Sequence, residues 1–172
     1  MRQIKINSTT GNEILTSQEV KDYVRIDTTS DDNIISAMIT QARIWCENYI
    51  SRDIVGKNRT YYLPTTNGVF DLPFGPVAII STVNVSGTNT TAFEVLGLDN
   101  ETIELDGGGA DRVKVTYITT GLNDSLIKQA MLQLISTYYD NRADFESGSS
   151  KEVSEIPTNT KVILTSYKTM FL

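Results

Sequence analysis

Apolar residues between positions 35 and 50 recur at steps of three and four, the spacing of one face of an α-helix. Thr16 stands three residues before Glu19, so the two can form a capping box, and a first helix is predicted to run to about Arg25. Asp31 and Asp32 suit the start of a second helix of about five turns. Its apolar stripe comprises Ile35, Met38, Ile39, Ala42, Trp45, Cys46, Tyr49 and Ile50.

The pattern changes between about Thr60 and Thr120 to short runs of alternating apolar and polar residues, broken by Gly, Pro, Asn and Asp. In the clearest run, residues 112–117, every second residue is apolar. This alternation predicts an antiparallel sheet unit with one face in water. Asp106 to Gly109 lie between two such runs, and a phosphate-binding loop would need a helix directly behind it. A hairpin turn is therefore favoured.

Helical spacing returns after Gly121, with Asn123 or Asp124 as the cap of a third helix that runs to about Arg142. Residues 143–155 are polar, which predicts a flexible linker, and Pro157 can begin a terminal helix at about 157–168. The predicted fold class is α+β, in one domain that spans residues 1–172. It comprises a small helical bundle (about 16–51 and 123–142), an inserted antiparallel β unit (about 60–120) and a terminal helix on a flexible linker.

The two long apolar stripes each need cover, so we expect them to form one helical core of Ile35, Met38, Ala42, Trp45, Leu134 and Tyr138. The terminal helix also has an apolar side, formed by Val162, Ile163, Leu164 and Tyr167. Because a linker separates it from the domain, we expect these residues, with Pro157, to bind a partner or a neighbouring subunit. Folding back onto the chain's own bundle is the alternative.

Tyr139 and Arg142, at the end of the third helix, are interface candidates, because Tyr and Arg are enriched at interfaces. Arg142 would also complement the helix dipole. Asp22, Asp27, Asp31 and Asp32 offer oxygen ligands for a divalent cation, but they lack the spacing of a calcium loop. Helix caps and a solvated loop explain these aspartates without a metal.

The amino-acid composition excludes several classes of function for this chain. The formal net charge of −6 disfavours generic binding to nucleic-acid phosphates. With no histidine and one cysteine, Cys46, the usual catalytic triads, zinc sites and intrachain disulfides are excluded. The longest apolar stretch is far shorter than the ~20 residues that span a bilayer, and no apolar signal core follows Met1, so no membrane contact is expected.

Several segments, taken in order, resemble a known family. They are residues 15–27 (LTSQEVKDYVRID), 31–35 (DDNII), 42–49 (ARIWCENY), 72–77 (LPFGPV), 113–117 (VKVTY), 127–130 (IKQA) and 138–142 (YYDNR). Their order and spacing over nearly the whole chain resemble the head-tail connector (adaptor) proteins of long-tailed phages, in the version with a β-rich insertion between the second and third helices. The chain departs from the family at its end, residues 167–172, which is not basic.

The resemblance implies a structural virion protein at the head-tail junction, assembled in the bacterial host cytoplasm, with no cofactor and no catalysis. It implies one subunit of a dodecameric ring that extends the DNA channel, through which DNA passes without specific binding. The implied partners are other copies, the portal protein and a stopper or tail-completion protein. The portal, or a neighbouring subunit, is then the expected partner of the terminal helix.

Two other functions stay open. One is another ring component of the virion, such as a tail-completion or stopper protein. The other is a small hydrolase that uses only carboxylates, which would need two of them facing each other across a cleft. Neither Asp140 with Glu146 nor Glu101 with Glu104 is placed convincingly as such a pair.

Overall fold

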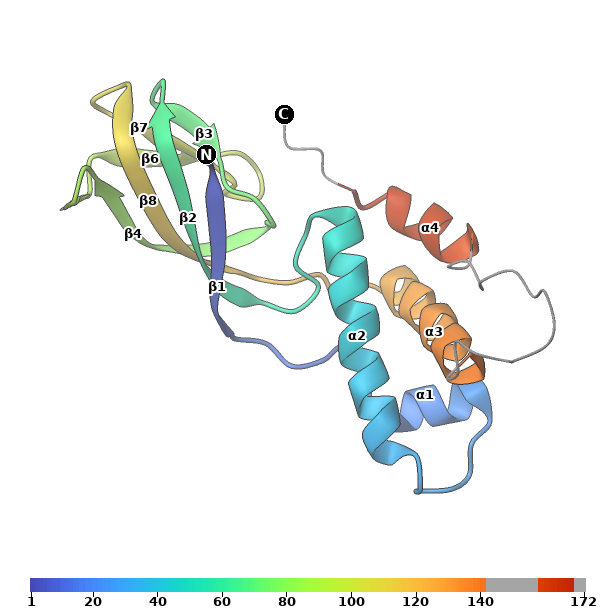
Figure 1. Ribbon diagram of the computed structural model, residues 1–172. Coiled ribbons are helices and arrows are strands. Elements are labelled where there is room, and N and C mark those ends of the chain that lie inside the picture. Colours follow the sequence, from blue (N-terminus) through green and yellow to red (C-terminus); the bar gives the residue numbers. More distant parts are fainter. Residues whose placement is uncertain (142–157, 169–172) are drawn as a thin grey trace. The chain divides into compact units, whose positions relative to one another are not determined.

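Residues 1–141 and 158–168 are described by the structure, a computed structural model. Their elements, in chain order, are β1 (Gln3–Thr9), α1 (Ser17–Val24), α2 (Asp32–Ile50), β2 (Lys57–Thr66), β3 (Val69–Asp71), β4 (Val77–Val85), β5 (Thr88–Thr90), β6 (Phe93–Leu96), β7 (Thr102–Leu105), β8 (Ala110–Thr119), α3 (Ser125–Asp140) and α4 (Thr158–Thr165). These elements form two compact units (Figure 1). The β unit comprises Met1–Asn12 and Ser51–Leu122, and the helical unit comprises Glu13–Ile50 and the described residues of Asn123–Lys168.

The β unit contains a five-stranded sheet in the order β1-β2-β8-β4-β5 and a three-stranded sheet in the order β3-β7-β6. Every named pair of neighbouring strands is antiparallel. The predicted turn at Asp106 to Gly109 connects β7 to β8, and Gly108 takes a φ of +72° there, which glycine adopts at no steric cost. The predicted α+β fold class with antiparallel sheets is confirmed.

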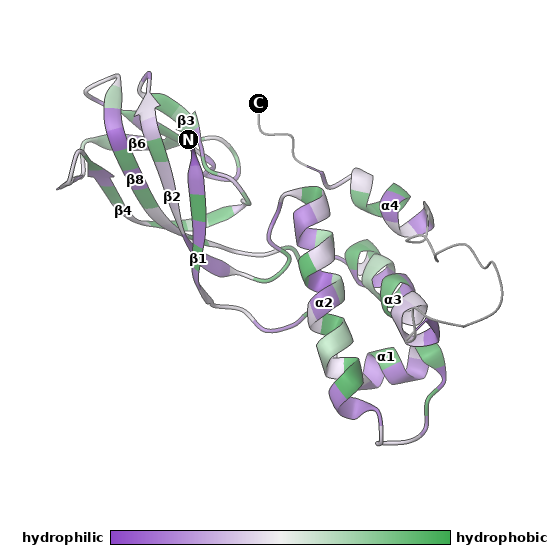
Figure 2. Ribbon diagram, viewed as in Figure 1, coloured by the Kyte–Doolittle hydropathy of each residue, from purple (hydrophilic) through white to green (hydrophobic). Residues whose placement is uncertain are grey.

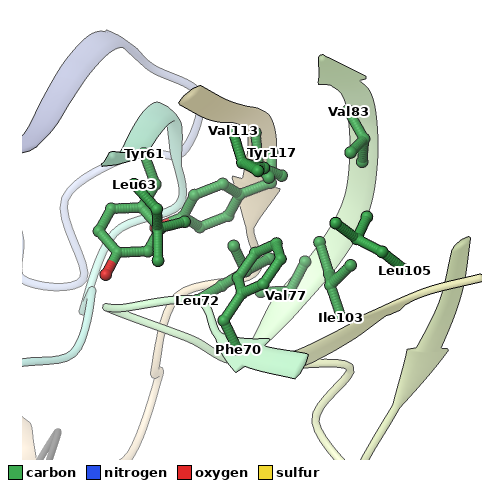
Figure 3. Close-up of a cluster of buried hydrophobic side chains, with 11 residues drawn as sticks. Tyr61, Leu63, Phe70, Leu72, Val77, Val83, Ile103, Leu105, Val113 and Tyr117 are labelled. Carbon is green, nitrogen blue, oxygen red and sulfur yellow. The ribbon is translucent and has the colours of Figure 1, made fainter. Parts of the chain in front are cut away.

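The core of the β unit lies between the inner faces of the two sheets (Figure 3). Val113, Val115 and Tyr117 of β8 are fully buried, and they alternate with residues that face water, as the sequence pattern predicts. The other sheet contributes apolar side chains such as Phe70 and Ile103. Removing this apolar surface from water holds the two sheets face to face.

The N-terminal strand β1 is missing from the sequence prediction, which began the β unit at about Thr60. β1 pairs with β2, and Lys5 lies opposite Thr60 in this ladder. Hydrophilic and hydrophobic residues alternate along β1 (Figure 2), but Ile4 and Ile6 stay 39% and 50% exposed. The strand is therefore held mainly by its backbone hydrogen bonds to β2, whose paired residues stand 48 to 59 positions away in the sequence.

The helical unit follows the predicted helices closely. The Thr16 hydroxyl accepts from the Glu19 amide at 3.2 Å and the Thr16 amide donates to Glu19 Oε2 at 2.7 Å, which is the predicted capping box. Asp124 caps α3 by accepting from the Leu126 amide at 2.8 Å. No helix among the described residues is long and apolar enough to cross a membrane.

Four of the six predicted core residues are buried in the helical unit: Ile35, Met38, Ala42 and Leu134. Trp45 and Tyr138 are only partly buried, so the prediction of one shared core is wrong for these two side chains. Trp45 instead stacks on Tyr49, with ring centroids 5.2 Å apart and planes 15° from parallel. Large aromatic rings at the border of a core often keep one face in water.

Candidate interaction surfaces

The terminal helix α4 packs on α3 within the helical unit (Figure 1). The Leu164 side chain is fully buried, and the buried Thr160 hydroxyl lies 3.4 Å from the Ala130 carbonyl oxygen of α3, to which it donates. Thr165 and Tyr49 of α2 share a hydroxyl hydrogen bond of 3.2 Å. Two helices therefore hold α4 by one apolar anchor and several polar contacts.

Tyr167, just after α4, donates its hydroxyl to Asp124 Oδ1 at 2.7 Å. This hydrogen bond is the main cause that lowers the pKa of Asp124, and the bond from the Leu126 amide lowers it further. The same bond raises the pKa of Tyr167, because the hydrogen bond to Asp124 stabilises the protonated hydroxyl and the charge of Asp124 disfavours the phenolate. The N-cap of α3 is thus also the attachment point for the chain after α4.

The residues predicted to bind a partner take different positions. Leu164 and Tyr167 contact the helical unit itself, Ile163 is partly buried and Val162 is 66% exposed. Pro157, Arg142 and the predicted linker at 143–155 lie outside the described residues. Val162 is thus available to a partner, and the role predicted for the set stays a prediction.

Tyr139 donates its hydroxyl to Asp31 Oδ2 at 2.6 Å and is partly buried. The neighbouring Asp32 accepts from the Lys21 ammonium at 2.9 Å. These contacts use the two aspartates at the start of α2 to connect α2 with α1 and α3. Among the described residues, no three or more carboxylate, cysteine or histidine side chains lie close enough together to bind a metal ion.

Two charged clusters were not predicted, since charged residues are mostly exposed. In the first, buried Arg43 of α2 donates to Glu47 Oε2 at 3.0 Å and to Glu13 Oε2 at 2.8 Å. The spacing of four residues between Arg43 and Glu47 was the visible signal. Beside them, burial raises the pKa of the Cys46 thiol to about 12, with a further rise from Glu47, so this cysteine is a packing residue.

The second cluster surrounds Asp53, which is completely buried in the β unit. Its Oδ1 accepts from Lys57 at 2.9 Å and Arg59 at 2.6 Å, and its Oδ2 accepts from Arg59 at 2.8 Å and Thr119 at 2.8 Å. The Arg59 guanidinium also lies 3.9 Å from the centroid of the Phe74 ring. All four polar residues are buried and satisfied, so the cluster holds β2 and β8 together and offers no group to a substrate.

One further carboxylate is a candidate for catalysis, Glu101. Burial is the main cause that raises its pKa, Arg52 lowers it, and the charges of Asp99 and Asp71 raise it by a smaller amount. Arg52 Nη2 donates to both Glu101 Oε1 and Asp99 Oδ2 at 3.0 Å. Two carboxylates that bind the same guanidinium nitrogen do not face each other across a cleft. This pair therefore lacks the arrangement that a glycosidase needs.

A family model for phage gp6-like head-tail connector proteins matches residues 15–104, just over half of the chain. The chain belongs to this head-tail connector family. The match includes α1, α2 and most strands of the β unit, so the connector family covers part of both units. The resemblance inferred from the sequence motifs is confirmed.

Solved structures contain chains with the fold of this connector. A chain from the neck of an empty gene transfer agent (GTA) particle, computed with C6 symmetry, is 17% identical with a TM-score of 0.71, over 99% of this chain and 97% of that chain. A chain from the neck of a native GTA particle, computed with C12 symmetry, is 18% identical with a TM-score of 0.65, over 98% of this chain and 97% of that chain. A comparison with curated protein sequences found no match.

Proposed function

We propose that the connector is a structural, non-enzymatic subunit of a tailed-phage virion. In this role it forms a ring on the portal at the head-tail junction, extends the DNA channel and provides a platform for a stopper or tail-completion protein. The family match over residues 15–104 carries the proposal. The likeness of almost the whole chain to neck chains in symmetric particles supports it, and both C6 and C12 symmetry are compatible with twelve copies.

The charge of the chain fits a passive channel component. A formal net charge of −6 gives the connector no overall attraction for DNA phosphates. Double-stranded DNA would pass such a ring without being gripped and without base-specific contacts. Assembly of the ring in the bacterial cytoplasm agrees with a single cysteine that is buried and has a raised pKa.

The terminal segment supplies a contact to the portal or to a neighbouring subunit in this proposal. Val162 is its exposed apolar side chain, and Ile163 is partly buried. An exposed apolar residue on a short helix can enter a groove of a partner while Leu164 keeps the helix on its own unit. Tyr139, near the end of α3, is a further candidate for this contact, and so is Arg142, which lies outside the described residues.

Electron microscopy of the purified connector mixed with the portal protein of the same particle tests the function. The expected result is a ring of connector density on one end of the portal, with twelve-fold symmetry. The rival role, a stopper or tail-completion protein, predicts no binding to the bare portal and binding only after another protein has covered it. Absence of any ring on the portal would contradict the proposed function.

A further inference from the structure

The outer face of the five-stranded sheet carries only positive charge among its charged residues. Lys5 of β1 and Arg112 and Lys114 of β8 are exposed there, and none of them forms an ion pair within the described residues. They border a hollow of about 810 Å³, and none of the residues that line it is acidic. We call this surface the basic face.

The outer face of the three-stranded sheet carries only negative charge. Asp71 of β3, Glu94 of β6 and Glu104 of β7 are exposed on it, next to the half-exposed apolar side chains of Val69 and Leu96. Glu94 lies directly opposite Glu104 in the ladder, and like charges in that position destabilise a sheet. We call this surface the acidic face. A positively charged partner would reduce the repulsion between its opposed glutamates.

The two faces point in opposite directions, because the core of the β unit fills the space between the sheets (Figure 3). Side chains alternate along each strand: Val113 and Val115 point into the core, and Lys114 between them points away. On the other sheet Ile103 points inward and Glu104 outward. One β unit thus presents opposite charges on its two opposite sides.

We propose that the basic face of one copy docks on the acidic face of the next copy around the ring. The inference rests on the proposed ring and identifies the surfaces that build it. Repeated head-to-tail contacts between two different surfaces of the same chain are the geometry that closes a ring. Complementary charge orients the contact, and apolar side chains such as Val69, Leu96 and Tyr62 supply area to bury.

A second copy fits these surfaces better than DNA does. DNA phosphates would neutralise the basic face, but they would leave the opposed glutamates of the acidic face without a partner. Docking of copies satisfies both faces in one contact. It also explains how a chain with a net charge of −6 keeps a cationic surface free of carboxylates.

Charge reversal tests the contact. One variant reverses the basic face (Lys5→Glu with Lys114→Glu) and another reverses the acidic face (Glu94→Lys with Glu104→Lys). Each variant alone brings like charges together, so we expect at least about tenfold fewer rings on the portal by electron microscopy and native mass spectrometry. An equimolar mixture of the two variants restores rings, because copies with two acidic faces alternate with copies that have two basic faces.

The control variant, Arg25→Glu with Lys128→Glu, changes the net charge as much as the first variant but does so in the helical unit. Circular dichroism melts of all variants check the fold, since every substituted side chain is exposed except that of Lys128, which is partly buried and lies 3.5 Å from Glu19 Oε1. Three results would overturn the docking proposal and leave the ring itself intact. Either face variant could form as many rings as the wild type, the control variant could lose as many rings as the face variants, or the mixture could fail to restore rings. Normal rings together with lost DNA binding by the Lys5→Glu, Lys114→Glu variant would assign the basic face to DNA and also overturn it. If the wild type forms no ring on the portal, the proposed function fails first.

Discussion

Tyr167 donates its hydroxyl to Asp124 Oδ1, and Asp124 is also the residue that caps α3. One carboxylate therefore serves two elements that stand more than forty positions apart in the sequence. The cap fixes the first turn of α3, and the tyrosine fixes the chain that leaves α4. The docking of α4 therefore depends on the N-cap of α3, which Asp124 can form whether or not α4 is docked.

Replacement of Tyr167 by Phe should loosen α4 and leave α3 intact. The aromatic ring of residue 167 and its packing stay, but the hydroxyl that binds Asp124 is removed. Asp124 keeps its hydrogen bond from the Leu126 amide. We expect several-fold faster amide hydrogen exchange in residues 158–168 and unchanged exchange at the start of α3. Tyr62→Phe, in the β unit, is the control. Equal exchange in the two variants would show that the hydrogen bond does not hold α4.

The same pair makes the docking of α4 depend on pH at both ends of the scale. Because the folded pKa of Asp124 is lowered from about 3.8, its contribution is present above that value and is lost as the pH falls through the lowered pKa. Because the folded pKa of Tyr167 is raised from about 10, its contribution is present below that value and is lost as the pH rises through the raised pKa. Protection of residues 158–168 should therefore be greatest between these limits. Tyr167→Phe should flatten the profile, and an unchanged profile would contradict the assignment.

Asp53→Asn should destabilise the connector strongly. The substitution removes the buried negative charge that Lys57 and Arg59 share, and breaking a buried ion pair typically costs about 3–5 kcal/mol. Asp99→Asn is the matched control. It breaks the ion pair between Asp99 and Arg52, and because the Asp99 side chain is half exposed, this pair contributes about 1 kcal/mol or less to stability. Urea unfolding of the two variants measures the difference. Similar unfolding free energies would show that the Asp53 cluster does not stabilise the β unit.

Local signals in the sequence predicted the bounds of the helices and of the clearest strand, β8, to within a few residues. The cap at Thr16 and Glu19, the cap at Asp124 and the alternation before Tyr117 each involve residues within a few positions of one another. Such signals predict local backbone structure directly, because the groups that form a cap or an alternating pattern are neighbours in the chain. Tertiary position was harder to predict: Trp45 has the correct helical spacing, yet it stacks on Tyr49 at the border of the core.

The features that were missed depend on distant partners. Asp53 is bound by Thr119 across 66 positions, and β1 is a strand only because β2 pairs with it. No window of sequence shows such pairs, and a buried aspartate is rare enough to be expected on the surface. The two charged faces have the same origin, since only the strand register brings Lys5 of β1 and Lys114 of β8 onto one surface.

Leu164 and Val162 separate the packing of α4 on its own unit from the proposed docking of the terminal segment. Leu164 is fully buried, so Leu164→Ala should lower the unfolding free energy of the free subunit by about 2–5 kcal/mol. Val162 is 66% exposed, so Val162→Asp should leave that free energy within about 0.5 kcal/mol of the wild type. If the terminal segment also contacts a partner, Val162→Asp reduces rings on the portal because a charge enters the apolar contact. Leu98→Asp, at an exposed leucine of the β unit, is the control. Rings formed equally well by both aspartate variants would show that α4 only packs on its own helices.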